Sequence, residues 1–344
     1  MIVRRLCKNV MLAFGTVLMF SCLVTAQQAG KNYAVLIGGL GGEPQYSEKF
    51  HKLLLDSQKA LIEQFHFPPE NVIVLAEKQP ENEVFVDGIS NAETITATFS
   101  DLALSVTEND YLYVVLFGHG SYDGNNAKLN IPRRDLADAD YGDMIDKINA
   151  GRIIFINTSS SSSPFVQHLS GERRIVIVAT KSPTQRNITS FPDFLIESFN
   201  DPSADVNKDG NLSVMEVFLY TAESTERFYT GRGNLATEHA MMDDNGDGRA
   251  SRFNELDINR EGALAEITYL KRQITVLAGS EMAQDSTLLK LLAEKEKIEL
   301  EIAQLKNQKY QYDEDIYYTM FEELMVELAR IANLLEPYQK IRNN

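Results

Sequence analysis

A histidine and a run of serines each follow an apolar segment of this chain, and both residue types suit acid–base or nucleophilic chemistry. Tyr111 to Phe117 runs directly into Gly118-His119-Gly120, and Arg152 to Asn157 runs into Thr158 and five consecutive serines that begin at Ser159. An imidazole has a pKa near neutrality and can give or take a proton. A serine hydroxyl beside such a base can act as a nucleophile. The alternatives are a surface histidine in a turn and a flexible serine-rich loop.

The two apolar segments predict the elements that would position these side chains. Neither segment alternates between apolar and polar residues, so each is typical of a strand buried on both faces of a parallel sheet. Open α/β sheets bind their ligands at the carboxyl ends of the strands. If the two strands are neighbours, His119 should lie close to one of the serines.

The rest of the chain predicts an α/β fold, a mostly parallel sheet covered by helices on both faces. Apolar runs alternate with segments of helical periodicity at intervals that suit strand–helix–strand units. The predicted strands span 32–38, 71–75, 111–117, 152–157 and 174–179, and the predicted helices span 47–65, 91–106, 141–149, 191–199 and 213–229.

These features resemble the caspase- and legumain-like cysteine peptidases. In that family an apolar strand ends in His-Gly, and about 35 residues later a second strand ends in a small residue and the catalytic cysteine; segment 237–248, Thr-Glu-His-Ala-Met-Met-Asp-Asp-Asn-Gly-Asp-Gly, is similar to bacterial members. The resemblance covers roughly residues 32–250. It implies a caspase-like sheet, with His119 as the catalytic histidine and the amide of Gly120 in the oxyanion hole. Ser159 stands where the family has its cysteine.

The first 26 residues are typical of a signal peptide, which predicts export to the periplasm or the extracellular space. Basic residues precede an apolar stretch, and Val24-Thr25-Ala26 suits a small-residue cleavage site. A membrane anchor and a lipoprotein cut before Cys22 are the alternatives. The chain has only two cysteines, Cys7 and Cys22, and both lie in this leader. Residues 27–344 therefore contain no thiol that could replace the missing nucleophile.

The charge of the chain argues against two classes of partner. The formal net charge is −16, and removing the three basic residues of the leader takes it to −19. A strongly acidic chain is a poor candidate for binding nucleic acid or anionic membranes. No segment after the leader is long and apolar enough to predict a membrane span. The ligand we expect is a peptide or a protein.

Segment 205–216 matches every position of a calcium-binding loop of the EF-hand type. Such a loop needs oxygen ligands at alternate positions, a glycine at the sixth position for a sharp turn, and a closing bidentate glutamate at the twelfth. The alternative is an acidic surface loop that binds nothing. The predicted ligands of Ca²⁺ are Asp205, Asn207, Asp209, Asn211 through its carbonyl group, Ser213 and Glu216.

A second acidic segment, Asp243 to Gly248, begins in the same way but does not finish the motif. Its twelfth position is Asn254, and Glu255 lies one place too late. Paired loops of this kind suggest a dockerin, but dockerin repeats sit closer together than these two. The sequence leaves metal binding at the second segment open, and it assigns no catalytic role to the nearby His239.

The composition changes at about residue 261, which divides a peptidase-fold domain (27–260) from a helical region (261–344). This region predicts a helical hairpin or coiled coil, with a break at Gly279-Ser280. The predicted function is oligomerisation, including a homo-oligomer, or partner docking; packing against the first domain is the alternative. The apolar positions are Ile267, Leu270, Ile274, Leu277, Leu291, Ile298, Ile302, Leu305, Phe321, Leu324, Leu328, Ile331 and Leu335.

Two functional hypotheses follow from these residues. The first is an exported peptidase-fold protein that has lost most of its activity and acts in calcium-dependent binding, because a serine hydroxyl is a far weaker nucleophile than a thiol without an oriented base. The second is an active hydrolase that uses Ser159, or Ser160 or Ser161, as nucleophile and His119 as general base.

Overall fold

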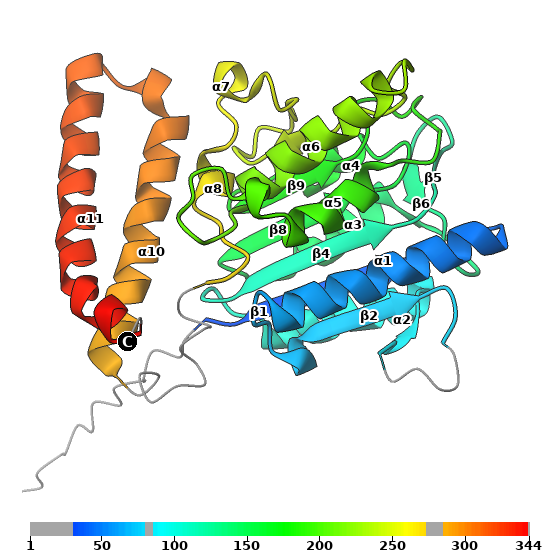
Figure 1. Ribbon diagram of the computed structural model, residues 1–344, viewed down its shortest axis with the longest axis horizontal. Coiled ribbons are helices and arrows are strands. Elements are labelled where there is room, and N and C mark those ends of the chain that lie inside the picture. Colours follow the sequence, from blue (N-terminus) through cyan, green and yellow to red (C-terminus); the bar gives the residue numbers. More distant parts are fainter. Residues whose placement is uncertain (1–29, 80–84, 273–284, 343–344) are drawn as a thin grey trace, which may run out of the picture.

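The fold is α/β, as predicted, and is built on a seven-stranded, mostly parallel sheet (Figure 1). The computed structural model describes residues 30–79, 85–272 and 285–342. The strand order is β3-β2-β1-β4-β8-β9-β10, and only β10 runs antiparallel to its neighbour. The strands are β1 Asn32–Gly38, β2 Val72–Ala76, β3 Gly88–Ile89, β4 Tyr111–Phe117, β8 Arg152–Asn157, β9 Arg174–Val178 and β10 Met241–Asp243.

Helices cover both faces of the sheet, because successive strand residues point to opposite sides and both sides are apolar. On β1, Ala34 and Leu36 face one core and Val35 and Ile37 face the other. The first core is closed by α1 Pro44–Glu63, α5 Phe191–Asn200 and α6 Val214–Thr230, and the second by α2 Ala92–Ser105, α3 Asp138–Ile145 and α4 Phe165–Leu169.

The predicted strands and helices of the first domain agree with the structure to within a few residues at their ends. The N-cap of α2 is Asn91, whose Oδ1 accepts the amide of Thr94 at 2.9 Å. The small sheet that follows His119 was not predicted. It consists of β5 Gly120–Tyr122, β6 Ala127–Leu129 and β7 Leu136–Ala137, and short 3-10 helices span Pro69–Asn71, Pro202–Ala204 and Lys309–Gln311.

The carboxyl-terminal region contains a helical hairpin, but the start of the predicted helix is wrong. Short helices α7 Leu256–Asn259 and α8 Ala263–Glu266 are followed by extended chain, in which the amide of Leu270 donates to the carbonyl of Leu212 at 3.0 Å. Ile267 and Leu270 pack against the first domain instead of forming a helical seam. The predicted break at Gly279-Ser280 and residues Ile274 and Leu277 lie outside the described residues.

The hairpin itself is formed by α10 Ser286–Asn307 and α11 Glu314–Arg342, which lie side by side (Figure 1). Their facing residues form a separate apolar cluster, so this seam is filled within one chain. The predicted apolar positions in the cluster are Leu291, Ile298, Ile302, Phe321, Leu324, Leu328, Ile331 and Leu335.

No helix among the described residues is both long and apolar enough to cross a membrane. The predicted signal peptide, residues 1–26, lies outside the described residues.

Candidate functional site

His119 lies at the carboxyl end of β4, where the sequence places it, and is packed among aromatic rings. Its ring meets the rings of Tyr46 and Phe50 of α1 edge-on, with centroids 5.0 Å and 5.2 Å away. Burial lowers the pKa of His119, and a backbone hydrogen bond with Gly41 acts in the opposite direction. The imidazole is therefore held between the rings of α1 and the loop after β1, and burial favours its neutral form.

Ser159 follows β8 and is fully buried, with 0% of its surface exposed. Its Oγ donates a hydrogen bond to Oδ1 of Asn157 at 2.7 Å, and its amide donates to the same oxygen at 3.0 Å. This is the asparagine turn expected of an Asn two residues before the donor. An amide oxygen accepts a hydrogen bond from the hydroxyl, but it is too weak a base to remove the hydroxyl proton. Asn157 is thus a site residue that the sequence reasoning missed.

The structure brings the histidine loop and the serine loop together through Gly120 and Ser160. The amide of Gly120 donates to Oγ of Ser160 at 3.1 Å, and that hydroxyl donates to the carbonyl of Gly120 at 3.0 Å. The Gly120 amide, expected to face an oxyanion, is therefore engaged by a side chain of the neighbouring loop. Among the described residues, no hydrogen bond joins His119 to Ser159.

Replacing Gly120 with alanine should lower the free energy of unfolding by about 2 kcal/mol, because the loops leave no room for a side chain. A β-carbon at position 120 would lie 1.9 Å from the carbonyl oxygen of Ser160 and 2.7 Å from Oγ of Ser159. Urea unfolding measures the change. Gly171→Ala is the control, since its β-carbon would meet only the flexible side chain of Arg174 at 3.3 Å. Equal stability of the two variants would contradict the packing described.

Gln185 connects the serine loop to His239, a contact that no sequence pattern indicated. Its carbonyl accepts the amide of Ser161 at 2.9 Å, and its Nε2 lies 2.7 Å from Nδ1 of His239. Ser161 has a φ of 55°, a left-handed conformation unusual for a residue other than glycine. Burial lowers the pKa of His239. His239 therefore supports the serine loop through Gln185.

Glu238, the neighbour of His239, has a structural role at the start of α5. Its carboxylate accepts the amides of Ser190 and Phe191 at 2.6 Å and 3.1 Å, and the hydroxyl of Tyr229 at 2.8 Å. Burial raises the pKa of this carboxyl above its usual range. Thr237-Glu238-His239 thus holds α5 and the serine loop in place.

A small pocket of about 240 Å³ lies beside this edge of the sheet. Phe50, which packs on His119, forms part of its wall together with Gly39, Leu54 and Ala76. The pocket is large enough for one side chain of a peptide, and its wall is mainly apolar.

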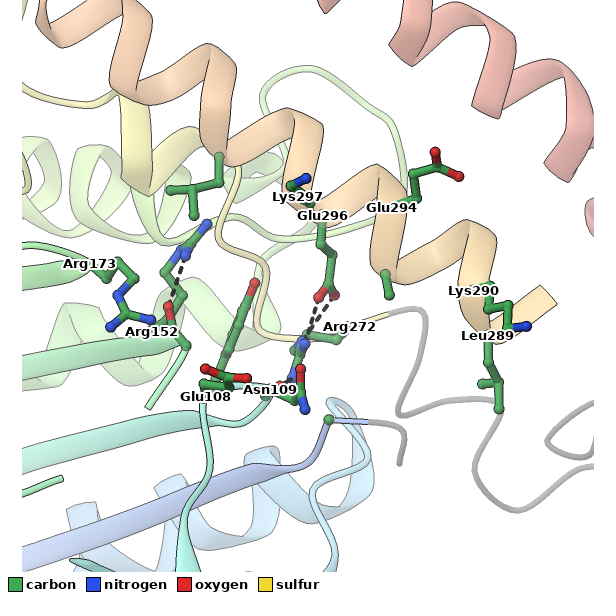
Figure 2. Close-up of a pocket in the computed structure, with 15 residues that line it drawn as sticks. Glu108, Asn109, Arg152, Arg173, Arg272, Leu289, Lys290, Glu294, Glu296 and Lys297 are labelled. Atoms are coloured by element: carbon green, nitrogen blue, oxygen red, sulfur yellow. Dashed lines mark hydrogen bonds and ion pairs between the residues drawn. The ribbon is translucent and has the colours of Figure 1, made fainter. Parts of the chain in front are cut away.

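A larger pocket, of about 660 Å³, lies at the opposite edge, between the amino ends of the strands and α10 (Figure 2). Arg272 crosses it: the guanidinium makes two hydrogen bonds to Glu296 of α10, at 3.2 Å and 2.7 Å, and stacks over the ring of Tyr111 at 3.6 Å. It also donates to the carbonyl of Asn109 at 3.2 Å. The side chains in this pocket join the hairpin to the sheet and are far from His119.

The predicted calcium loop, residues 205–216, has the backbone form of an EF-hand loop. The carboxylate of Asp205, at position 1, accepts the amides of Asp209 and Gly210 at 3.2 Å and 2.9 Å. Positions 4 and 6, Lys208 and Gly210, have φ values of 59° and 79°. Ser213, at position 9, caps α6, since its Oγ accepts the amide of Glu216 at 3.2 Å.

Glu216, at position 12, folds back over the beginning of this loop. Its Oε1 accepts the amides of Val206 and Asn207 at 3.1 Å and 3.3 Å, and its Oε2 accepts the amide and hydroxyl of Ser213. The donor set consists of oxygens only and so suits Ca²⁺. Within the described residues, however, no three His, Cys, Asp or Glu side chains are grouped so as to hold one ion. The loop is preformed, and its carboxylates accept hydrogen bonds from the backbone amides of the loop. A Ca²⁺ ion would be held by Asp205, Asn207, Asp209, the carbonyl of Asn211, Ser213 and Glu216.

The sequence matches no model of a known protein family, and it matches no curated protein.

Proposed function

We propose that this chain is an exported, peptidase-fold binding protein of the caspase/legumain-like type, in which the serine at the nucleophile position does not cut peptides. The observation that carries the proposal is the hydrogen bond from the buried hydroxyl of Ser159 to Oδ1 of Asn157, at 2.7 Å. A serine needs an adjacent base to become a nucleophile, and this hydroxyl has an amide oxygen instead. The mostly parallel sheet with His119 and Ser159 on adjoining loops supports the family resemblance.

The ligand we propose is a peptide or a protein segment that binds at the edge containing His119. The small pocket beside Phe50 offers an apolar side-chain site, and the imidazole of His119 offers a hydrogen-bonding group at the same edge. The net charge of −16 disfavours nucleic acid as the ligand.

Treatment with a fluorophosphonate probe tests the absence of catalysis. We expect no covalent labelling of Ser159, because its hydroxyl donates to Asn157 and no hydrogen bond joins it to His119 among the described residues. Trypsin, which reacts with the same probe, shows that the reagent is active. Labelling of Ser159 that disappears in His119→Ala would instead establish the second hypothesis, an active serine hydrolase.

We propose Ca²⁺ as the ion that stabilises this protein through the loop at 205–216. At a concentration about 100 times the Kd, one bound ion would add about 2.7 kcal/mol to the free energy of unfolding. Calcium should therefore raise the Tm of the metal-stripped protein, and raise it less in Glu216→Gln. Glu223→Gln, a change at an exposed position of α6, is the control. An equal shift of Tm in Glu216→Gln and Glu223→Gln would contradict a role for this loop.

The hairpin provides the surface that we propose for a second copy of the chain or another protein. Its seam is filled internally, but α11 also exposes apolar side chains that the hairpin does not use. These are Ile316, Tyr318, Met325, Val326 and Leu334.

A further inference from the structure

The second acidic loop, which begins at Asp243, shares most of the backbone hydrogen bonds of the loop at 205–216. It differs at position 1, where Asp243 accepts the amide of position 4 and the hydroxyl of Ser170, whereas Asp205 accepts the amide of position 5. Position 1 accepts the amide of the glycine at position 6 in both loops, Asp205 from Gly210 and Asp243 from Gly248. The side-chain oxygen at position 3 accepts the amide at position 5, and the carboxylate at position 5 accepts the amide at position 7, again in both. Positions 4 and 6 have positive φ in each loop: 59° and 79° in the first, 79° and 78° in the second.

Position 9 also forms an isolated β-bridge in each loop, with a distant residue in the first loop and with the residue directly before position 1 in the second. Ser213 forms a bridge with Tyr269, and Ser251 forms a bridge with Met242. The only part of the pattern that the second loop lacks in sequence is the glutamate at position 12. Asn254, at that position, and Glu255, the next residue, are both exposed.

A glutamate from further along the chain occupies the missing position. In the first loop, Oε1 of Glu216 accepts the amides at positions 2 and 3. In the second loop, Oε2 of Glu261 accepts the amides at positions 2 and 3, those of Asp244 and Asn245, at 2.7 Å and 3.2 Å. Glu261 therefore makes the same two contacts as the closing glutamate of the first loop, although it lies six residues beyond Glu255.

Asp244 positions Glu261. Its carboxylate accepts the amides of Gly262, Leu264 and Ala265 at 2.6–2.8 Å, which ties the chain directly after Glu261 to position 2 of the loop. The side chain of Asp244 thus fixes the backbone directly after Glu261 relative to the loop.

The carboxyl groups of Asp243, Asp244 and Glu261 form a buried cluster that no basic side chain of the described residues neutralises. Asp243, Asp244 and Glu261 are 0%, 3% and 6% exposed, and no ion pair links any of them to a Lys or Arg of the described residues. Oε1 of Glu261 is buried and has no hydrogen-bond partner. A buried carboxylate oxygen without a donor is costly unless a cation or a proton meets it.

We infer that residues 243–251 together with Glu261 form a second Ca²⁺ site, a calcium loop closed by a glutamate from outside the twelve-residue motif. The side chains of Asp243, Asn245, Asp247 and Glu261, the carbonyl of Arg249 and the hydroxyl of Ser251 supply the oxygens. An all-oxygen set of this size on a flexible loop suits Ca²⁺ better than Mg²⁺, which demands near-octahedral geometry and retains its water.

Counting bound ions in the metal-stripped full chain tests this site. We expect isothermal titration with CaCl₂ to find two ions in the wild type and in Glu255→Gln, the matched control at the neighbouring exposed glutamate. Glu261→Gln should bind one ion, and so should Glu216→Gln, because each variant loses a different site. Each loss follows from removing the closing carboxylate, which supplies the bidentate ligand of such a loop.

The first site can fail without affecting this inference. If the loop at 205–216 binds nothing, the wild type holds one ion, which Glu261→Gln loses and Glu216→Gln keeps. An unchanged number of ions in Glu261→Gln would overturn the inference. Asp247→Asn changes an exposed ligand and should also remove the ion, which separates loss of binding from a folding defect in Glu261→Gln.

Discussion

Replacing Arg272 with alanine should lower the free energy of unfolding by about 2 kcal/mol, because a buried guanidinium loses its stacking on Tyr111 and its hydrogen bonds to Glu296. Arg272 is 4% exposed and makes two hydrogen bonds to Glu296 while it stacks on Tyr111. It is also the link between the sheet and α10. Urea unfolding measures the loss, and hydrogen exchange of the α10 amides should accelerate in the same variant.

Arg330→Ala is the matched control for this prediction. Arg330 also pairs with glutamates, Glu327 and Glu294, but its side chain is 50% exposed. An exposed ion pair contributes about 0–1 kcal/mol. If the two substitutions cost the same, then the buried arginine does not hold the hairpin to the sheet.

The second large effect is expected at Glu238. Glu238→Ala should cost about 3 kcal/mol, since it leaves the buried amides of Ser190 and Phe191 and the hydroxyl of Tyr229 without their acceptor. Glu93→Ala is the control, because Glu93 also lies in the first turn of a helix but is exposed. Thermal unfolding at neutral pH compares the two, and a loss no larger than that of the control would contradict the role of Glu238.

The free energy of unfolding should depend on pH through the titration of the Glu238 carboxyl. Burial raises the pKa of Glu238 in the folded state, so the folded protein holds this proton more tightly than the unfolded chain does. Its contribution is fully present below the pKa of an unfolded glutamate, about 4.3, and is lost as the pH rises through the folded value. The wild type should therefore lose stability relative to Glu238→Gln as the pH rises across that window.

The sequence alone predicts the sheet and its helices well, because their signals are local. Tyr111–Phe117 and Arg152–Asn157 are built around apolar runs typical of buried strands, and Asn91 marks the start of α2 with a side-chain cap. The calcium loop at 205–216 is a prediction of the same local kind, because its proposed ligands lie at fixed spacing within twelve residues.

Contacts between distant residues could not be predicted in this way. Glu261 lies 18 residues after Asp243, and only the fold brings it to the loop. The extended run at Leu270 was mistaken for a helix because its three- and four-residue spacing is helical, whereas pairing with Leu212 decides its conformation. The hydrogen bond from Ser159 to Asn157 could have been predicted from the sequence, because an asparagine two residues before the donor is typical of an asparagine turn.

The outermost strands of the sheet have a consequence for self-association. β3 has two residues and β10 has three, and the free side of β10 is already occupied where Met242 pairs with Ser251. Few backbone groups are left at either border to template an additional strand from another molecule. Copies of this protein cannot readily join sheet to sheet, so β-type stacking and fibre growth are disfavoured by the architecture itself.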